Sequence, residues 1–231
     1  MAPSSQDAAV ERRGERTRHA LVTSAEALFA ERGFEATRLE DVALAVGIKR
    51  ASIVYYFRDK AELYDAVLAH VFGGLREQLE QALESDDDAL VAVERAVGTW
   101  VDAVGRRPSI AKLLLREVAD AGRDRGPALL PHLEPFFAVV ESFLARHRAD
   151  PRLGRAPVGP AHVASTIAGS TVFFVAALVP LVPNVGFDPL NESHLRRHRD
   201  EVLNILRLLL GVGGAELSAP SEPANGGRDG P

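Results

Sequence analysis

The 231-residue sequence contains no cysteine. Disulfide bonds, thiolate zinc sites and cysteine nucleophiles are therefore excluded, which fits a protein from a reducing compartment. The first residues also lack a basic start followed by an apolar stretch, so no secretory signal is predicted. We expect a cytoplasmic protein.

The familiar motifs of catalysis are missing as well. The sequence has no Gly-x-Ser-x-Gly, no phosphate-binding loop and no His-Glu-x-x-His. His194 and His198 are one helical turn apart, with Glu201 near the same face, which is a spacing that could suit a metal. Three arginines between 196 and 199 oppose a cation there. We therefore expect no enzyme, no cofactor and no metal site.

Alternation of apolar and polar residues, the mark of a β-strand, is also absent. Apolar residues recur instead at intervals of three and four, which predicts an all-α fold of about nine helices. Residues 1 to 11 and 216 to 231 are rich in Pro, Gly, Ser, Ala and Asp, with little to bury. Both ends are predicted to be disordered.

The first helix is expected from about Thr17 to Arg32, with Gly33 as its stop. Thr37 and Glu40 then have the spacing of a capping box, in which each side chain satisfies a free amide at a helix start. They predict a short second helix that ends at Gly47.

A third short helix is expected from Lys49 to Phe57. Asp59 follows as another helix cap and opens a long fourth helix that reaches about Ala82. Two short helices joined at a glycine turn, with a longer helix before them, form the helix-turn-helix that places its second helix in the DNA major groove. The sequence thus predicts a DNA-binding head near its N-terminus.

The charge and side chains of this segment favour DNA. Residues 1 to 60 have a net charge of +1 although the whole chain has −5, so a weakly basic head joins an acidic body. The third helix begins with two cations, a small residue and a hydroxyl, and ends with two tyrosines. The expected DNA-contacting residues are Arg38, Lys49, Arg50, Ala51, Ser52, Tyr55, Tyr56 and Lys60.

Each of these residues taken singly also fits a core aromatic or a solvated turn, and only their order favours DNA binding. Four arginines precede the first helix or lie in its first turns, at positions 12, 13, 16 and 18. They form either an arm that touches phosphates or the minor groove, or a solvated helix start.

Residues 17 to 64 resemble the TetR family of transcriptional regulators. The resemblance lies in an ordered series of segments: Phe34-Glu35-Ala36-Thr37, Asp41-Val42-Ala43, Gly47-Ile48 and Ser52-Ile53-Val54-Tyr55-Tyr56-Phe57-Arg58-Asp59-Lys60. Two positions depart from the family, which often has Tyr in place of Val54 and Ser or Thr in place of Lys49. The remaining helices agree with the family only in number, size and order.

This resemblance implies a helix-turn-helix domain over residues 12–60 and a helical ligand-binding and dimerisation domain over 61–215. It also implies a ligand-responsive regulator, and we expect a repressor that a small molecule releases from a palindromic operator. The rival function is a helical carrier of apolar small molecules that does not bind DNA.

The last two helices, over about 161–181 and 192–211, have the pattern of a dimer face. Close approach of helices is favoured by a set of small residues: Ala161, Ala164, Ser165, Ala168 and Gly169. The final helix has apolar residues at near-heptad intervals: Leu195, Val202, Ile205, Leu206 and Leu209. In the TetR-like arrangement these helices form a four-helix bundle in a homodimer. Packing within one chain, or a membrane span over the uncharged residues 156–187, are the alternatives.

An apolar effector pocket is expected among the middle helices. The candidate lining residues are Trp100, Leu114, Val118, Phe136, Phe137, Val140 and Phe173. Arg116 and Glu117 interrupt an apolar stretch, and Glu117 could orient a polar ligand group. Ordinary core packing is the alternative for each apolar residue.

Overall fold

The computed structural model describes residues 5–84, 88–120, 128–154, 156–181 and 188–212. All regular structure in these ranges is helical, which confirms the predicted all-α fold. The elements are α1 (Ser5–Ala36), α2 (Leu39–Val46), α3 (Arg50–Ile53), α4 (Lys60–Leu83), α5 (Ala89–Arg106), α6 (Ser109–Asp120), α7 (Leu130–Arg146), α8 (Pro151–Gly154), α9 (Pro160–Val172), the π-helical segment η1 (Phe173–Ala177), α10 (Leu178–Leu181) and α11 (Glu192–Leu210). The one-turn helices α8 and α10 are too short to show a periodicity in the sequence.

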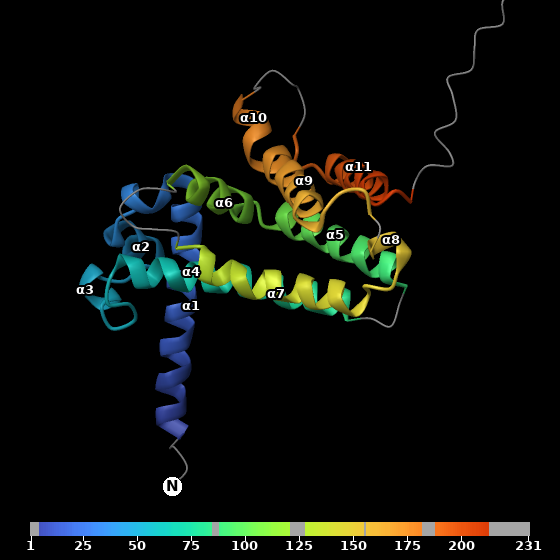
Figure 1. The fold of residues 1–231 in the computed structure, drawn as a ribbon. Coiled ribbons are helices and arrows are strands. Elements are labelled where there is room, and N and C mark those ends of the chain that lie inside the picture. Colours follow the sequence, from blue (N-terminus) through green and yellow to red (C-terminus); the bar gives the residue numbers. More distant parts are fainter. Residues whose placement is uncertain (1–4, 85–87, 121–127, 155, 182–187, 213–231) are drawn as a thin grey trace, which may run out of the picture.

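Helix α1 begins at Ser5, well before the predicted start at Thr17. The prediction that residues 1 to 11 are disordered is therefore wrong from Ser5 onward, whereas residues 1 to 4 and the predicted tail lie outside the described residues. The prediction weighed only apolar burial, and this stretch is rich in Ala, Glu and Arg, which favour a helix on their own. In Figure 1 this part of α1 projects away from the rest of the chain.

The end of α1 is shaped by Gly33, whose φ of 82° and ψ of 174° interrupt the helix where the sequence predicts its stop. Thr37 is buried, and its hydroxyl donates to the carbonyl oxygens of Leu28 and Gly33 at 3.2 and 2.7 Å. The predicted capping box is thus wrong, because the hydroxyl satisfies the end of α1. The N-cap of α2 is Arg38, with no capping side chain.

The turn between α2 and α3 is the predicted one. Gly47 adopts the left-handed conformation, with φ 75°, and closes α2. Helix α3 is a single turn, shorter than the predicted 49–57, and the amides of Tyr56 and Phe57 then bond to the carbonyl of Ile53 at 2.8 and 2.9 Å. Asp59 caps α4 by accepting from the amide of Glu62, as predicted.

One apolar cluster runs through the first part of the fold and onward into the rest. It includes Phe29 of α1, Ile53 of α3, Val67 of α4, Leu113 of α6 and Val175 of η1. The core is therefore continuous across residue 60, where the sequence places a domain boundary. Helices α2 and α3 lie at one end of the molecule, and α4 leads away from them alongside α7 (Figure 1).

Helix α5 is at the centre of the remaining helices. A second cluster joins it to α4 and α7, and a third joins it to α9 and α11. Gly105 lets α11 approach α5 closely, since an added Cβ would lie 3.0 Å from the Cδ1 atom of Leu195. These contacts fix α11 and α9 over α5 (Figure 1).

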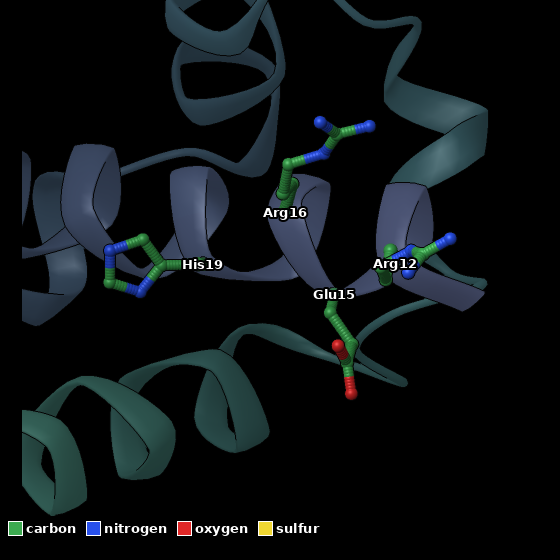
Figure 2. A pocket seen from close by; sticks show the side chains of 4 residues that line it. All are labelled: Arg12, Glu15, Arg16 and His19. Atoms are coloured by element: carbon green, nitrogen blue, oxygen red, sulfur yellow. The ribbon is translucent and has the colours of Figure 1, made fainter. Parts of the chain in front are cut away.

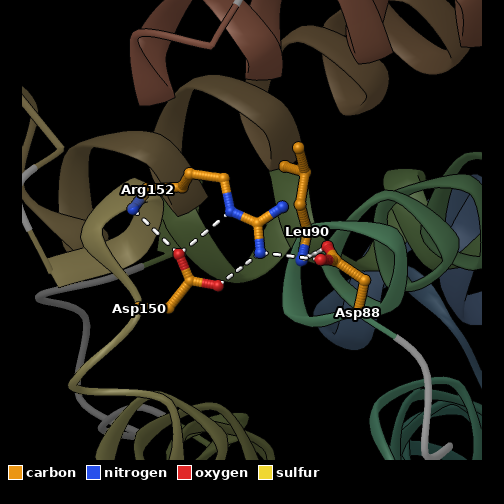
Figure 3. Close-up of polar contacts among 4 residues, drawn as sticks. All are labelled: Asp88, Leu90, Asp150 and Arg152. Carbon is orange, nitrogen blue, oxygen red and sulfur yellow. Dashed lines mark hydrogen bonds and ion pairs between the residues drawn. The ribbon is translucent and has the colours of Figure 1, made fainter.

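The far end of this body is tied by Arg152, which follows α7 in the chain (Figure 3). Its guanidinium binds Asp150 and, at 2.8 Å, Asp88, the N-cap of α5. The hydrogen bond from the Arg152 side chain, and then that from its amide, lower the pKa of the Asp150 carboxyl to about 2. The start of α5 is thereby joined to α8.

Helices α9 and α11 turn one side outward. On α9 the outer residues are small and include Ala161, Ser165 and Gly169, as predicted for a close helix contact. On α11 the prediction is only partly right, because Val202 and Leu206 are buried within the chain whereas Ile205 and Leu208 are exposed. The stretch Pro160–Ala177 is long and apolar enough to cross a membrane, with mean hydropathy 1.3 and 22% of it buried.

Two glycines of α1 offer a matched test of its geometry. Gly33→Ala forces a Cβ into a backbone conformation that is essentially restricted to glycine, with the Cβ 3.2 Å from Nη1 of Arg116. We expect a loss of about 1–3 kcal/mol in the free energy of unfolding. Gly14→Ala, at a helical position with open space, should give a gain of about 0.5–1 kcal/mol. Urea denaturation measures both, and equal effects would contradict this account of Gly33.

Candidate DNA-binding surface and effector region

The α2–turn–α3 unit presents the predicted contact residues on one surface. Lys49, Arg50 and Ala51 are exposed, and Tyr55 is 85% exposed while Ser52 and Tyr56 are half-buried. A core aromatic would be buried, so the alternative reading fails for Tyr55. Arg38, at the start of α2, is also exposed.

Two exposed apolar residues on this unit were not predicted as contacts. Leu44 of α2 is 80% exposed and Val54, which follows α3, is 60% exposed. The TetR family often has Tyr in place of Val54, and here the exposed valine puts an apolar group on the surface of this unit. Such a group can contact the methyl group of thymine.

The cations of the surface are not equivalent. Arg50 forms an ion pair with Glu40 of α2. Lys60 donates to the carbonyl oxygens of Phe34 and Glu35 at 2.8 and 3.2 Å and lies over the Phe34 ring. The Lys60 ammonium therefore fastens the α1–α2 connection, whereas Lys49 is exposed at the start of α3.

The arginines of α1 divide between two settings. Arg18 lies over the ring of Phe57, with 4.8 Å from its guanidinium carbon to the ring centre. This contact joins α1 to the residues that follow α3. Arg12 and Arg16 line a wide open hollow of about 600 Å³ with Glu15 and His19, and point outward from α1 (Figure 2). Glu15 offsets part of their charge.

A buried carboxylate joins α1 to the junction of α5 and α6. Glu26 of α1 is 7% exposed and accepts hydrogen bonds from Arg107, through Nε and Nη2, and from the hydroxyl of Ser109. Burial raises the pKa of the Glu26 carboxyl, but the hydrogen bonds from Arg107 and Ser109 outweigh it and hold that pKa below its usual value of 4.5. The contact links residues that are 81 positions apart, and no local pattern predicts such a pair.

His70 of α4 stands beside this contact. Its ring meets that of His19 edge to face, with centroids 5.4 Å apart. Burial and then the charge of Arg107 lower the pKa of His70, although Glu26 opposes them. The imidazole is therefore neutral at neutral pH. A small hollow of about 240 Å³ next to Arg107 is lined by residues of α4, α5 and α6.

Helix α6 adds further bonds to α1. Arg116 donates from Nε to the carbonyl oxygen of Ala30 at 3.0 Å and also binds the carbonyl oxygen of Glu31. Lys112 pairs with the Glu31 carboxylate at 3.0 Å. These bonds join the end of α1 to α6.

Glu117, predicted to orient a ligand, is part of the same framework. It is buried, and its carboxylate accepts from the hydroxyl of Tyr64 at 2.7 Å and from the amide of Leu129 at 3.2 Å. Tyr64 is on α4 close to the head, and Leu129 immediately precedes α7. Glu117 thus connects three helices of the body.

The predicted effector residues fall into two groups. Trp100, Leu114 and Phe136 are half-buried and pack against the main cluster. Val118, Phe137 and Phe173 are 74%, 51% and 49% exposed. The sequence missed Phe174, which also packs against the main cluster and stacks on His198 with centroids 4.1 Å apart.

The two histidines of α11 have separate partners. His194 bonds through Nδ1 to the carbonyl oxygen of Asp188 at 2.7 Å, and the His198 ring is stacked on Phe174. Burial lowers the pKa of His198, so this ring is neutral at neutral pH. Over the described ranges, no group of three His, Asp or Glu residues is placed to hold a metal ion.

The Glu26 contact predicts a dependence of stability on pH. A carboxyl whose pKa is depressed in the folded state stabilises the fold above its usual pKa of 4.5, and this stabilisation is lost as the pH falls through the folded value. Glu26→Gln should lower the free energy of unfolding by about 1–3 kcal/mol at pH 7. It should also flatten the loss of stability below pH 4.5, as measured by urea denaturation at a series of pH values.

Glu31→Gln is the control on the same helix. Glu31 is exposed and pairs with the partly exposed Lys112, so its replacement should change stability by less than about 1 kcal/mol. If the two variants behave alike, the buried contact does not have the role given to it here.

Known proteins are similar to this chain in two ways, in the sequence of its N-terminal part and in its overall fold. Residues 21–67 match the family model of bacterial regulatory proteins, tetR family. The structure is similar to that of the transcriptional regulator FadR from Bacillus subtilis in complex with stearoyl-CoA, with 15% identity, 81% of this chain and 96% of that chain covered, and a TM-score of 0.62. It is also similar to the ketosteroid transcriptional regulator KstR2 of Mycobacterium tuberculosis, with 19% identity, 84% and 93% covered, and a TM-score of 0.63.

A third similar structure is that of AibR in complex with isovaleryl coenzyme A and operator DNA. It has 16% identity, 84% of this chain and 98% of that chain covered, and a TM-score of 0.63. At these identities the likeness is one of fold, and it extends over the body as well as the head.

Proposed function

Because the chain belongs to the tetR family of bacterial regulatory proteins, we propose that it is a homodimeric repressor that a small molecule releases from a palindromic DNA operator. The observation that carries this proposal is the surface around α3, where exposed cations, a hydroxyl and an exposed tyrosine follow a tight glycine turn. Residues 12–60 form the DNA-binding head, and residues 61–215 form the body for effector and partner.

Within this proposal the contact residues have distinct roles. Lys49, Arg50, Ala51 and Ser52 enter the major groove, where Arg50 reads a base edge. Tyr55 and Tyr56 bind phosphate oxygens, as does Arg38 at the start of α2. Lys60 positions the helices of the head, because its ammonium already has two carbonyl partners.

The partner subunit packs on the outer face of α9 and α11. The small residues of α9 allow close helix approach, and the exposed Ile205 and Leu208 of α11 supply apolar area. This use also accounts for the apolar stretch Pro160–Ala177 without a membrane. Two heads about 34–36 Å apart then meet successive major grooves of a palindromic site.

Release from DNA follows from the bonds between body and head. An effector that binds better to one arrangement of α5, α6 and α7 shifts α6, and the bonds of Arg107 and Arg116 pass the shift to α1. Helix α4 is a second route, through Tyr64 and Glu117. Since FadR and AibR were solved with acyl-CoA molecules, acyl thioesters are the first effectors to test.

Selection of bound duplexes from a random DNA pool tests the proposal. The purified protein at moderate salt should enrich a palindromic consensus. Arg50→Ala should weaken binding by about 1–3 kcal/mol and relax one position of the site, and Tyr55→Phe should weaken binding at all sequences. Arg146→Ala, an exposed change at the end of α7, is the control. No enrichment with or without acyl thioesters would favour the carrier function instead.

Glu40 gives a second test, in the opposite direction. Glu40→Gln removes an anion from the surface and frees Arg50 from its ion pair. Operator affinity should rise about threefold to tenfold, with a steeper fall at high salt because one anion that repels the phosphates is removed from the surface. Glu141→Gln, on the exposed side of α7, should leave both unchanged. Weaker binding by the Glu40 variant would mean that the pair orients Arg50.

A further inference from the structure

The body contains one buried donor that the fold leaves unused. Trp100 is the only tryptophan of the chain, and its Nε1 atom is buried with no hydrogen-bond partner. Within the part of the chain that the structure describes, no other buried side-chain nitrogen or oxygen is in this position. Such an unmet donor costs about 1–3 kcal/mol. An acceptor supplied by another molecule would satisfy it.

The surroundings of Trp100 are those of an apolar binding region. The ring is half-buried on α5 and packs against both the main cluster and the cluster of α5, α9 and α11. Leu114 of α6, Phe136 of α7 and Phe174 of η1 are also partly buried and pack against the main cluster. The indole therefore lies where the main cluster meets the cluster of α5, α9 and α11.

Helix α9 is irregular where it meets this region. It passes into the π-helical segment Phe173–Ala177, whose wider turn is uncommon and is often found at functional sites. Phe174 is held there by its stack on His198, while the adjacent Phe173 is 49% exposed. An apolar molecule can thus gain contacts that the free chain does not make.

The charges of the region limit the kind of acceptor. On α5, Asp102 pairs with Arg199 at 3.3 Å and Glu94 pairs with Arg207 at 2.7 Å. Glu117 accepts from Tyr64, and His198 is neutral. A carboxylate brought to the indole would lose its hydration without gaining a cation, which is costly. An uncharged carbonyl oxygen meets the donor without that loss.

We propose that Trp100 donates a hydrogen bond from Nε1 to an uncharged carbonyl of the effector, which is a hydrophobic thioester or ketone. This inference rests on the proposed function only in assuming that the body binds a small molecule. It restricts the effector to molecules with a carbonyl group inside their apolar part. It also assigns the indole of Trp100 as the group that recognises this carbonyl.

Because the chain has a single indole, its ¹⁵N–¹H resonance is a direct readout. The ¹⁵N-labelled full-length protein is titrated with decanoyl-CoA and with S-decyl-CoA, the thioether that lacks the carbonyl. A second pair is 2-undecanone and undecane. The carbonyl member of at least one pair should move the indole proton downfield and bind about tenfold more tightly than its match.

Trp100→Phe keeps an aromatic ring and removes the donor. It should retain operator affinity, which shows that the variant is folded. The decanoyl-CoA concentration for half release of the operator should rise about tenfold, whereas that for S-decyl-CoA should not change. This cycle isolates the bond between indole and carbonyl from the loss of ring contacts.

The outcomes separate this inference from the proposed function. Equal binding of both members of each pair, an equal loss for both in Trp100→Phe, or no indole shift with any probe overturns the carbonyl assignment. Operator binding by the wild-type protein would then still support the regulator. If no operator is found, the indole shift still decides the assignment, because it is measured without DNA.

Discussion

The buried carboxylate of Glu26 is the contact on which the arrangement of head and body depends. Arg107 and Ser109 meet it at the junction between α5 and α6, so the last turn of one helix and the first of the next are fixed to α1 together. Removing any one partner leaves a charge or a donor with little water to replace it. The position of α1 therefore depends on a bond between residues that are 81 positions apart in the sequence.

This constraint changes how the body is expected to control the head. Helix α4 is one link, because it is long and runs from the helix-turn-helix into the rest of the fold. The structure adds a second set of bonds, from Arg107, Lys112 and Arg116 to α1. Because the two links reach different helices of the head, they can rotate the head as well as displace it. The continuous apolar core resists separation of the head from the body.

The local features were the ones that could be predicted. Gly33, Gly47 and Asp59 act through their own backbone or the next turn, and each ends or begins a helix where the pattern places it. Predictions failed where a side chain had two possible partners. The hydroxyl of Thr37 turned back to α1. The sequence also could not show that Glu117 bonds to Tyr64, 53 positions earlier in the chain. No periodicity carries information about such distant partners.

The outer face of α9 has a consequence for partner choice. Ala161, Ser165 and Gly169 give close contact but have no charge, and a surface of this kind adheres without discriminating among similar surfaces. In a cell that contains other proteins of this fold, mixed dimers would carry two different heads and recognise no proper palindrome. Discrimination then falls to the charged residues exposed on α11, among them Arg196, Arg197, Asp200 and Glu201. If this face joins the subunits as proposed, these charges decide which partner is accepted, and the uncharged helix beside them supplies the strength of the contact.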